Sequence, residues 1–348
     1  MAVTDGFVDA VLESPLGVAL LAQLEPRVRY PEGRRLFLET DAASVAAAAE
    51  AVSGMSFGAL VQLAVLTGWH DVGPWIADAG ETVAVAYRQA EARAPIAEAL
   101  DDRFGASLHE SIDREIQQWW TTGGRSIDRV APLFRNYELV YGAGQFTWAG
   151  LWTVSDPPEV ANAELAAAWE LDDGAITRWR LPVLPEARVL EVHRPADWAR
   201  LVREHPRAAV SGQEGWELPG PNQQRSEVSM LAAVGGQCAA RTEVRRHLVP
   251  DWRSVGDHYD GVHLSWAGFI TAEGCITDLD GGDVARLRYW SSERTHWLAD
   301  VFGEPEPRPA PRLPEWAAHS GNEVPIDIGP NSDRRRQDEQ ALRQLLGR

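Results

Sequence analysis

Apolar residues in the first third of the chain recur at helical spacing. Residues 57–69 (FGALVQLAVLTGW) are apolar on nearly every side, which predicts a buried helix. An Ala-rich segment follows Asp41, and Gly54 stands near its end. Alanine favours helix and an aspartate before the first turn accepts the free N–H groups there, so a second helix with Asp41 as its N-cap is predicted.

Two further helices are expected before the pattern changes. Residues 81–100 are good helix formers with a break expected at Pro95. Residues 107–120 include an i,i+4 pair of opposite charge and end before two glycines, which predicts a helix. We therefore expect a helical domain over residues 1–125.

Aromatic and β-branched residues broken by glycine replace this pattern from about residue 130 onward. Such segments favour strands. A helix is expected over 197–205 between them, and residues 304–314 alternate Pro with charge, which indicates an extended linker. Strands are expected over 136–154 (a hairpin), 175–185, 187–195, 261–271, 274–279 and 284–290.

These elements predict an α+β fold, in which a helical N-terminal layer is followed by a mixed or antiparallel sheet. The sheet domain is assigned to residues 126–303, and residues 304–348 are assigned to the Pro-rich linker and a C-terminal tail.

Composition narrows the classes of partner. The chain has 348 residues and a formal net charge of -18. A surface this acidic repels nucleic acid and anionic lipid, so neither is expected as a partner. No apolar run approaches the roughly 20 residues of a membrane span, and the N-terminal residues do not resemble a secretory signal.

The cationic residues are all arginine, because the sequence contains no lysine. This excludes a lysine Schiff base and a P-loop lysine, and leaves arginine to bind phosphate or carboxylate. The Arg and Ala usage is typical of a high-GC, actinobacterial genome. Two cysteines in a long chain, Cys238 and Cys275, favour free thiols and a cytoplasmic location, although their pairing stays open.

Candidate chemistry concentrates in residues 251–298, which hold four Trp, three His and several Asp. Asp257, His258, Asp260 and His263 are possible metal ligands, but their spacing matches no established metal motif, and polar residues at a strand entrance explain them better. We predict no metal. The Asp-Gly run over 278–283 predicts a hairpin turn rather than a calcium loop.

Arginine and tryptophan supply the expected binding groups. Arg241 and Arg245 lie four residues apart, and if residues 239–247 are helical both can clamp a phosphate or carboxylate. Their alternative role is surface charge. Most Trp residues are expected in the core, and some can stack on a base or a sugar. The sequence identifies no cofactor.

Two resemblances bear on function. The segments ARVLEVHRPADWARLVREHP and VPDWRSVGDHYDGVHLSWAGFIT resemble those of an uncharacterised actinobacterial family, over about residues 187–298. This implies that the region is one domain.

The order of polar residues also resembles the ADP-ribosyltransferase superfamily. That likeness implies that His193 or Arg194 anchors a ribose, Tyr259 or Ser265 shapes the nicotinamide pocket, and Glu293 stabilises an oxocarbenium-like ribose. The usual Glu-x-Glu is missing apart from Glu304-Pro305-Glu306.

Two classes of function remain. In the first, the chain is a cytoplasmic enzyme, with a transferase among the expected activities, and has a Trp-lined pocket for a phosphate-bearing or nucleotide-like small molecule. In the second, it is an acidic immunity or antitoxin-type protein that binds a basic partner. For the enzyme, the expected catalytic residues are His193, Asp260, His263 and Glu293, and the expected ligand-binding residues are Arg241, Arg245, Tyr259, Ser265 and Trp266.

Overall fold

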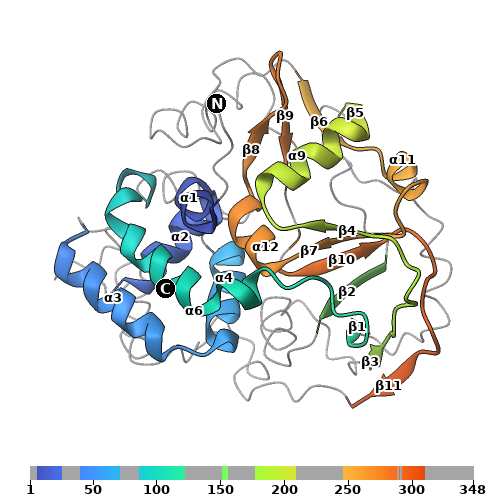
Figure 1. Cartoon of the computed structure of the whole chain (residues 1–348), viewed down its shortest axis with the longest axis horizontal. Helices are drawn as coiled ribbons and strands as arrows, with labels where there is room; N and C mark the ends of the chain where they lie inside the picture. The colour runs from blue at the N-terminus through green and yellow to red at the C-terminus, as the bar shows by residue number, and fades with distance from the viewer. Residues whose placement is uncertain are drawn as a thin grey trace, which may run out of the picture.

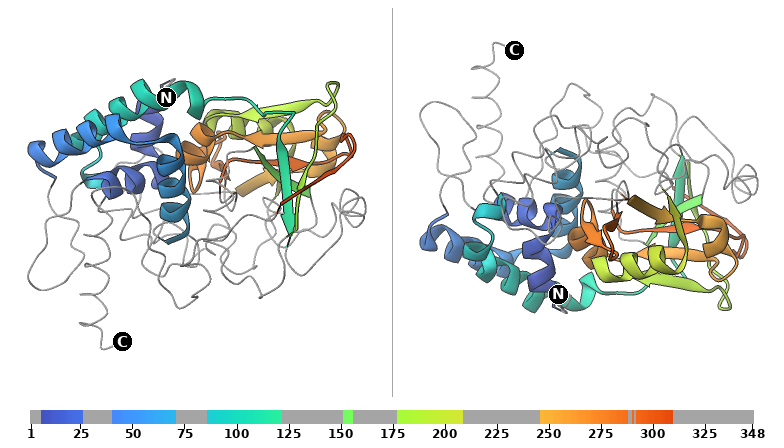
Figure 2. Two further views of the ribbon diagram at one scale, coloured as in Figure 1. Left: turned by 90° about the horizontal axis from the view of Figure 1, so that it is seen from below. Right: turned by 90° about the horizontal axis from the view of Figure 1, so that it is seen from above.

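A layer of helices from the first third of the chain lies beside two β-sheets (Figure 1). Figure 2 shows the helical layer and the sheets side by side in both views. The predicted α+β class, with its helical N-terminal layer, is confirmed. The structure is a computed structural model, and it describes residues 6–25, 40–70, 86–121, 151–155, 177–208, 246–287, 290 and 292–309.

Helix boundaries in the first layer follow local capping chemistry. The Ser14 hydroxyl accepts a hydrogen bond from the Gly17 N–H, and the Asp41 carboxylate accepts one from the Ser44 N–H, as predicted for Asp41. The predicted apolar helix is also confirmed. The elements are α1 (Phe7–Glu13), α2 (Pro15–Leu24), α3 (Ala42–Gly54), α4 (Phe57–His70), the short η1 (Glu91–Arg93) and α6 (Ala94–Leu108).

The break expected at Pro95 is present, because a turn and η1 separate helical residues 86–88 from α6, and Pro95 lies in the first turn of α6, where its missing N–H has no intrahelical partner to lose. One helix prediction needs correction. The helix predicted over 107–120 is wrong, since α6 ends at Leu108 and the chain becomes strand β1 at Gln117. The paired Trp119 and Trp120 suit a strand, and neighbouring strands override the i,i+4 charge pattern.

The larger sheet has seven strands in the order β11-β3-β1-β2-β10-β7-β4, and a second sheet has the order β5-β6-β9-β8. In the larger sheet all described pairings are antiparallel except that of β4 with β7. The strands are β1 (Gln117–Thr121), β2 (Leu151–Ser155), β3 (Thr177–Arg180), β4 (Val189–Val192), β5 (Pro206–Ala208), β6 (Arg246–Pro250), β7 (Gly261–Leu264), β8 (Ile276–Asp278), β9 (Asp283–Arg286), β10 (Arg294–Trp297) and β11 (Glu306–Arg308).

Three helices follow strands or connect them. They are α9 (Pro195–Glu204), α11 (Trp252–Gly256) and α12 (Trp266–Ala272). The strand predicted over 261–271 is therefore wrong beyond Leu264. Ser265 caps α12, and a Cβ on Gly268 would lie 2.2 Å from the Val192 carbonyl oxygen, so only glycine allows this close crossing.

Three further predictions concern the turn after β8, the Pro-rich segment and the cysteines. The Asp-Gly run forms the expected turn between β8 and β9, with positive φ at Asp280, Gly281 and Gly282. Residues 304–314 are extended as predicted where described, but β11 belongs to the sheet. Cys275 is disulfide-bonded, which corrects the expected free thiol, and Cys238 lies outside the described residues.

One hydrophobic core joins the helical layer to the sheets. It runs from Phe7 in α1 through α12 to one face of the larger sheet. A smaller core around Trp297 and Leu151 covers part of the opposite face. Within the described ranges no single helix has the length and hydropathy of a membrane span, although α1 and α2, bent by 95°, pass that test as a pair.

Candidate functional site

Polar side chains gather at one edge of the larger sheet. His193 and Ser265 follow the last residues of the parallel strands β4 and β7. Strand β10 runs the opposite way, so Glu293, just before its first residue, comes to the same edge. The carboxyl ends of neighbouring parallel strands are a frequent place for binding sites in α/β sheets.

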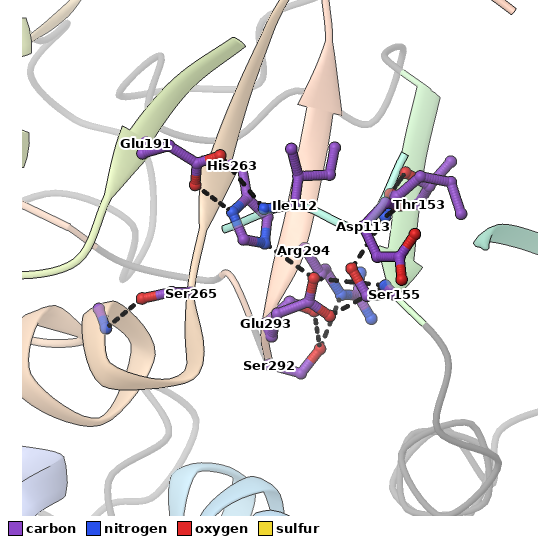
Figure 3. A network of polar contacts seen from close by, with 12 residues as sticks. Ile112, Asp113, Thr153, Ser155, Glu191, His263, Ser265, Ser292, Glu293 and Arg294 are labelled. Carbon is purple, nitrogen blue, oxygen red and sulfur yellow. Dashed lines mark hydrogen bonds and ion pairs between the residues drawn. The ribbon is translucent and has the colours of Figure 1, made fainter. Parts of the chain in front are cut away.

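A glutamate–histidine–glutamate triad extends inward from this edge (Figure 3). The Nδ1 atom of His263 lies 2.5 Å from Oε2 of Glu191, and its Nε2 atom lies 2.9 Å from Oε1 of Glu293. The strand register places Glu191 directly opposite His263, and the imidazole then spans the distance to Glu293. Glu191, His263 and Glu293 are called the triad below.

The triad holds a charged imidazole inside the protein. Burial alone lowers the pKa of His263, but hydrogen bonds and charge from Glu191 and Glu293 outweigh burial and raise it to about 9. At neutral pH His263 is an imidazolium that donates to both carboxylates. Solvent reaches only Glu191: the side-chain exposure is 24% for Glu191, 2% for His263 and 4% for Glu293.

Backbone and side-chain donors fix the two carboxylates. The Ser155 N–H donates to Oε2 of Glu293 at 3.1 Å, and the Ile112 N–H donates to Oε1 of Glu191 at 3.2 Å. Gln117 extends the network, because its amide donates to the Ser155 hydroxyl at 2.9 Å while its carbonyl oxygen accepts from Thr153. The triad is therefore anchored on both sides.

His193 stands next to the triad and is half-buried. Its Nδ1 atom lies 3.0 Å from the Ser265 hydroxyl oxygen, and its backbone N–H donates to Asp197 at 3.1 Å. Burial lowers its pKa, with Glu191 opposing and with His263 and His109 contributing to the decrease. His193 is thus neutral at neutral pH, in contrast to His263.

Other tryptophan side chains gather on the opposite face of the sheet, whereas Trp297 lies on the triad face, where its indole N–H donates to the Thr153 hydroxyl at 2.7 Å. Adjacent side chains of a strand point to opposite faces, so His296 and Trp152 face away from His263 and Thr153. The His296 ring stacks on Trp152 at 4.4 Å and meets Trp252 edge-on at 4.7 Å. Trp290 touches Trp152 and Trp198. These five rings, called the aromatic cluster, belong to or pack against the main core rather than the triad.

Four of the predicted site residues come together. His263 and Glu293 are hydrogen-bonded to each other, and His193 is hydrogen-bonded to Ser265 one step along the same edge. Their contribution to activity stays a prediction.

Three other predicted residues lie elsewhere. Asp260 is at the far end of β7, where it pairs with Arg188 at 3.0 Å, and that hydrogen bond lowers the pKa of Asp260. Tyr259 meets the ring of His205, and Trp266 is buried against Phe269. Geometry therefore separates Asp260, Tyr259 and Trp266 from the triad.

The structure does not bring the two predicted phosphate-binding arginines or the possible metal ligands of residues 257–263 into one described site. Arg241 and Arg245 lie outside the described residues, and Arg246 already belongs to strand β6 rather than to a helix over 239–247. His258 binds the Ser254 carbonyl through Nδ1. Among the described residues no three His, Cys, Asp or Glu side chains converge as metal ligands.

Sequence reasoning missed Glu191, the solvent-facing member of the triad. A signal was present, since a glutamate between Leu190 and Val192 in a predicted strand must face away from the core that those residues enter. Ser155 and Gln117 gave no such signal, because their contacts depend on strand pairings far apart in the sequence. Comparison of the chain with family models, curated proteins and solved structures finds no match.

Proposed function

We propose that the protein is an enzyme that uses Glu191 as a general base on a small-molecule substrate. The observation that carries the proposal is a partly exposed carboxylate hydrogen-bonded to a fully buried imidazolium, which is itself held by a buried second carboxylate. Burying three charged groups is costly, and such networks cluster at functional sites.

Each triad member has a distinct task in this proposal. Glu191 takes a proton from a substrate hydroxyl or a water molecule. His263 fixes the orientation of that carboxylate through the 2.5 Å contact between Nδ1 and Oε2. Its imidazole also stays protonated at neutral pH and so keeps a positive charge next to Glu191. Glu293 touches no substrate, and as a positioning residue it holds the imidazolium.

The finer parts of the functional prediction remain proposals. The phosphate-bearing or nucleotide-like substrate depends on arginines outside the described residues, and ADP-ribosyl transfer remains a prediction. The buried Glu293 carboxylate, occupied by His263 and by the Ser155 N–H, better supports a positioning role than direct contact with a ribose. A cytoplasmic location and binding to a basic partner protein also remain predictions.

The experiment compares wild-type protein with Glu191→Gln on three probes, p-nitrophenyl phosphate, p-nitrophenyl acetate and NAD+. We expect turnover of at least one probe by the wild type and a loss of about 10²- to 10⁴-fold in the variant, which is the range for removal of a general base. Glu25→Gln is the matched control, because Glu25 also pairs with a buried cation, Arg93, but in the helical layer. The proposal would be contradicted if the wild type turned over none of the three probes, or if Glu191→Gln turned them over as fast as the wild type.

A further inference from the structure

A second histidine at the same edge is fixed in one orientation by a buried serine. The Ser265 hydroxyl oxygen already accepts a hydrogen bond from the Gly268 N–H at 3.1 Å, as the N-cap of α12. The hydroxyl also has one proton to donate. Whether it donates that proton to His193 Nδ1 decides which nitrogen of His193 carries hydrogen.

Two acceptors lie within reach of the Ser265 hydroxyl. His193 Nδ1 is at 3.0 Å, whereas the Val192 carbonyl oxygen is at 3.5 Å and already accepts the Ser265 backbone N–H at 3.1 Å. A contact of 3.5 Å is at the limit of a hydroxyl hydrogen bond. The hydroxyl proton therefore belongs on the line to Nδ1, and Nδ1 accepts it as an unprotonated nitrogen.

The other nitrogen of the ring is then the donor. Because His193 is neutral, a bare Nδ1 requires a proton on Nε2. Nε2 has no hydrogen-bond partner within the described part of the chain, and the His193 side chain is only partly buried. The groups that face this ring are Glu191, His263, His109 and Asp197.

We infer that His193 presents its Nε2–H to an oxygen of the substrate, and that Ser265 holds it in that tautomer. This inference rests on the proposed function, because the substrate oxygen that accepts from His193 must lie beside the substrate group from which Glu191 removes a proton. The substrate then carries an acceptor oxygen, carbonyl or phosphoryl, next to the reacting hydroxyl or water. A neutral imidazole that donates a hydrogen bond polarises such an oxygen and, unlike His263, adds no positive charge to the site.

The tautomer is measured on the full chain, without substrate. Protein labelled with ¹⁵N at its nine histidines is examined by long-range ¹H–¹⁵N correlation at pH 7.5, and His193 is assigned from the spectrum of His193→Gln. We expect a pyridine-like Nδ1 and a pyrrole-like Nε2. A pyrrole-like Nδ1, or a doubly protonated ring, would overturn the inference.

Serine variants test the positioning role. Ser265→Ala removes the hydroxyl, and we expect His193 to become a mixture of tautomers, whereas Ser265→Thr keeps the hydroxyl and the single tautomer. Ser14→Ala is the matched control, because Ser14 is also a buried N-cap, of α2, but does not touch His193. An unchanged tautomer in Ser265→Ala contradicts the role of Ser265. If that variant does not fold, the wild-type and Thr spectra still decide.

This measurement separates the inference from the proposed function. A failure of Glu191→Gln to lower turnover removes the general base but leaves the His193 tautomer where Ser265 fixes it. A wrong tautomer removes the oxygen contact and leaves the triad unaffected.

Discussion

His263 and His296 lie on adjacent strands of one sheet and both are fully buried, but at neutral pH His263 is positively charged and His296 is neutral. His263 on β7 donates to two carboxylates, and its pKa is raised to about 9. His296 on β10 faces the aromatic cluster, neither of its ring nitrogens has a hydrogen-bond partner among the described residues, and burial lowers its pKa to about 3. Burial alone therefore does not set the charge of a histidine, since the face of the sheet decides what the ring meets.

The two faces also differ in what they offer a ligand. The triad face combines a charged imidazole, a solvent-reachable carboxylate and a neighbouring neutral histidine. The aromatic face is closed by rings in contact with one another, and Trp198 and Trp290 are almost fully buried. Strand alternation thus separates most of the polar chemistry from the aromatic cluster, although the two are interleaved in the sequence, and Trp297 is the exception because its indole N–H donates to Thr153 on the triad face.

The largest expected effect on stability comes from His263→Phe on the triad face, and the same substitution at His296 on the aromatic face is its counterpart. His263→Phe leaves two carboxylates facing an apolar ring, and we expect the free energy of unfolding to fall by about 3–5 kcal/mol, the cost of breaking a buried ion pair. Urea unfolding at pH 7 measures it. A loss below about 1 kcal/mol would mean that the triad is weakly coupled to the fold.

The pH dependence of stability follows with opposite signs for the two histidines. A folded pKa of about 9 for His263 means that its contribution is fully present below pH 6.5 and is lost as pH rises toward 9. The total loss is about 3 kcal/mol. Because the chain contains no lysine, no lysine ammonium titrates at the upper end of this window.

For His296 the sign is reversed, because its folded pKa of about 3 lies below the ordinary value. Stability is present above pH 6.5 and falls as pH drops toward 3, and His247, also with a pKa of about 3, acts in the same direction. Urea unfolding from pH 4 to 9.5 gives both limbs. A flat profile from pH 6.5 to 9.5 contradicts the assignment for His263.

The two glutamates of the triad are expected to differ according to their exposure. Glu293→Gln removes a charge from a buried contact, and we expect a loss of about 2–3 kcal/mol, whereas Glu191→Gln, whose side chain is partly solvated, should lose about 1 kcal/mol. Glu306→Gln, in a pair with Arg180 whose side chains are 45% and 22% exposed, is the control and should lose less than Glu293→Gln. Equal losses at both triad positions would contradict the difference in environment.

The smallest effect is expected on the aromatic face. His296→Phe replaces an imidazole that has no hydrogen-bond partner in the described ranges by a ring that can also stack on Trp152. Removing the unsatisfied polar atoms should leave stability within about 1 kcal/mol of the wild type, on the stabilising side. Thermal and urea unfolding both report it. A loss above about 2 kcal/mol would show that the imidazole makes a contact that matters.

The parts of the fold that depend on local chemistry could be predicted from the sequence. The Asp41 cap, the apolar helix α4, the start of α9 near Pro195 and the turn at Asp280 all come from residues within a few positions of one another. Strand β1 could not be predicted in this way, because its hydrogen bonds come from β2 and β3, which are distant in sequence.

The candidate site divides along the same line. His193, His263, Ser265 and Glu293 stood out as polar residues near predicted strands, and the structure brings them to one edge. Pairing His263 with Glu191 needed the parallel register of β4 and β7, and separating Asp260 from them needed the direction of β7. Neither is encoded in a short motif.

The charge state of His263 is the property on which the triad and the contrast between the two faces most depend. In protein with ¹⁵N-labelled histidine, the two ring nitrogens of His263 are followed from pH 5 to 10, with His263→Gln for assignment. We expect a doubly protonated ring through pH 8 that loses its proton near pH 9. A ring that is already neutral at pH 7 would contradict the buried imidazolium on which the triad, the general base and the comparison of the two faces depend.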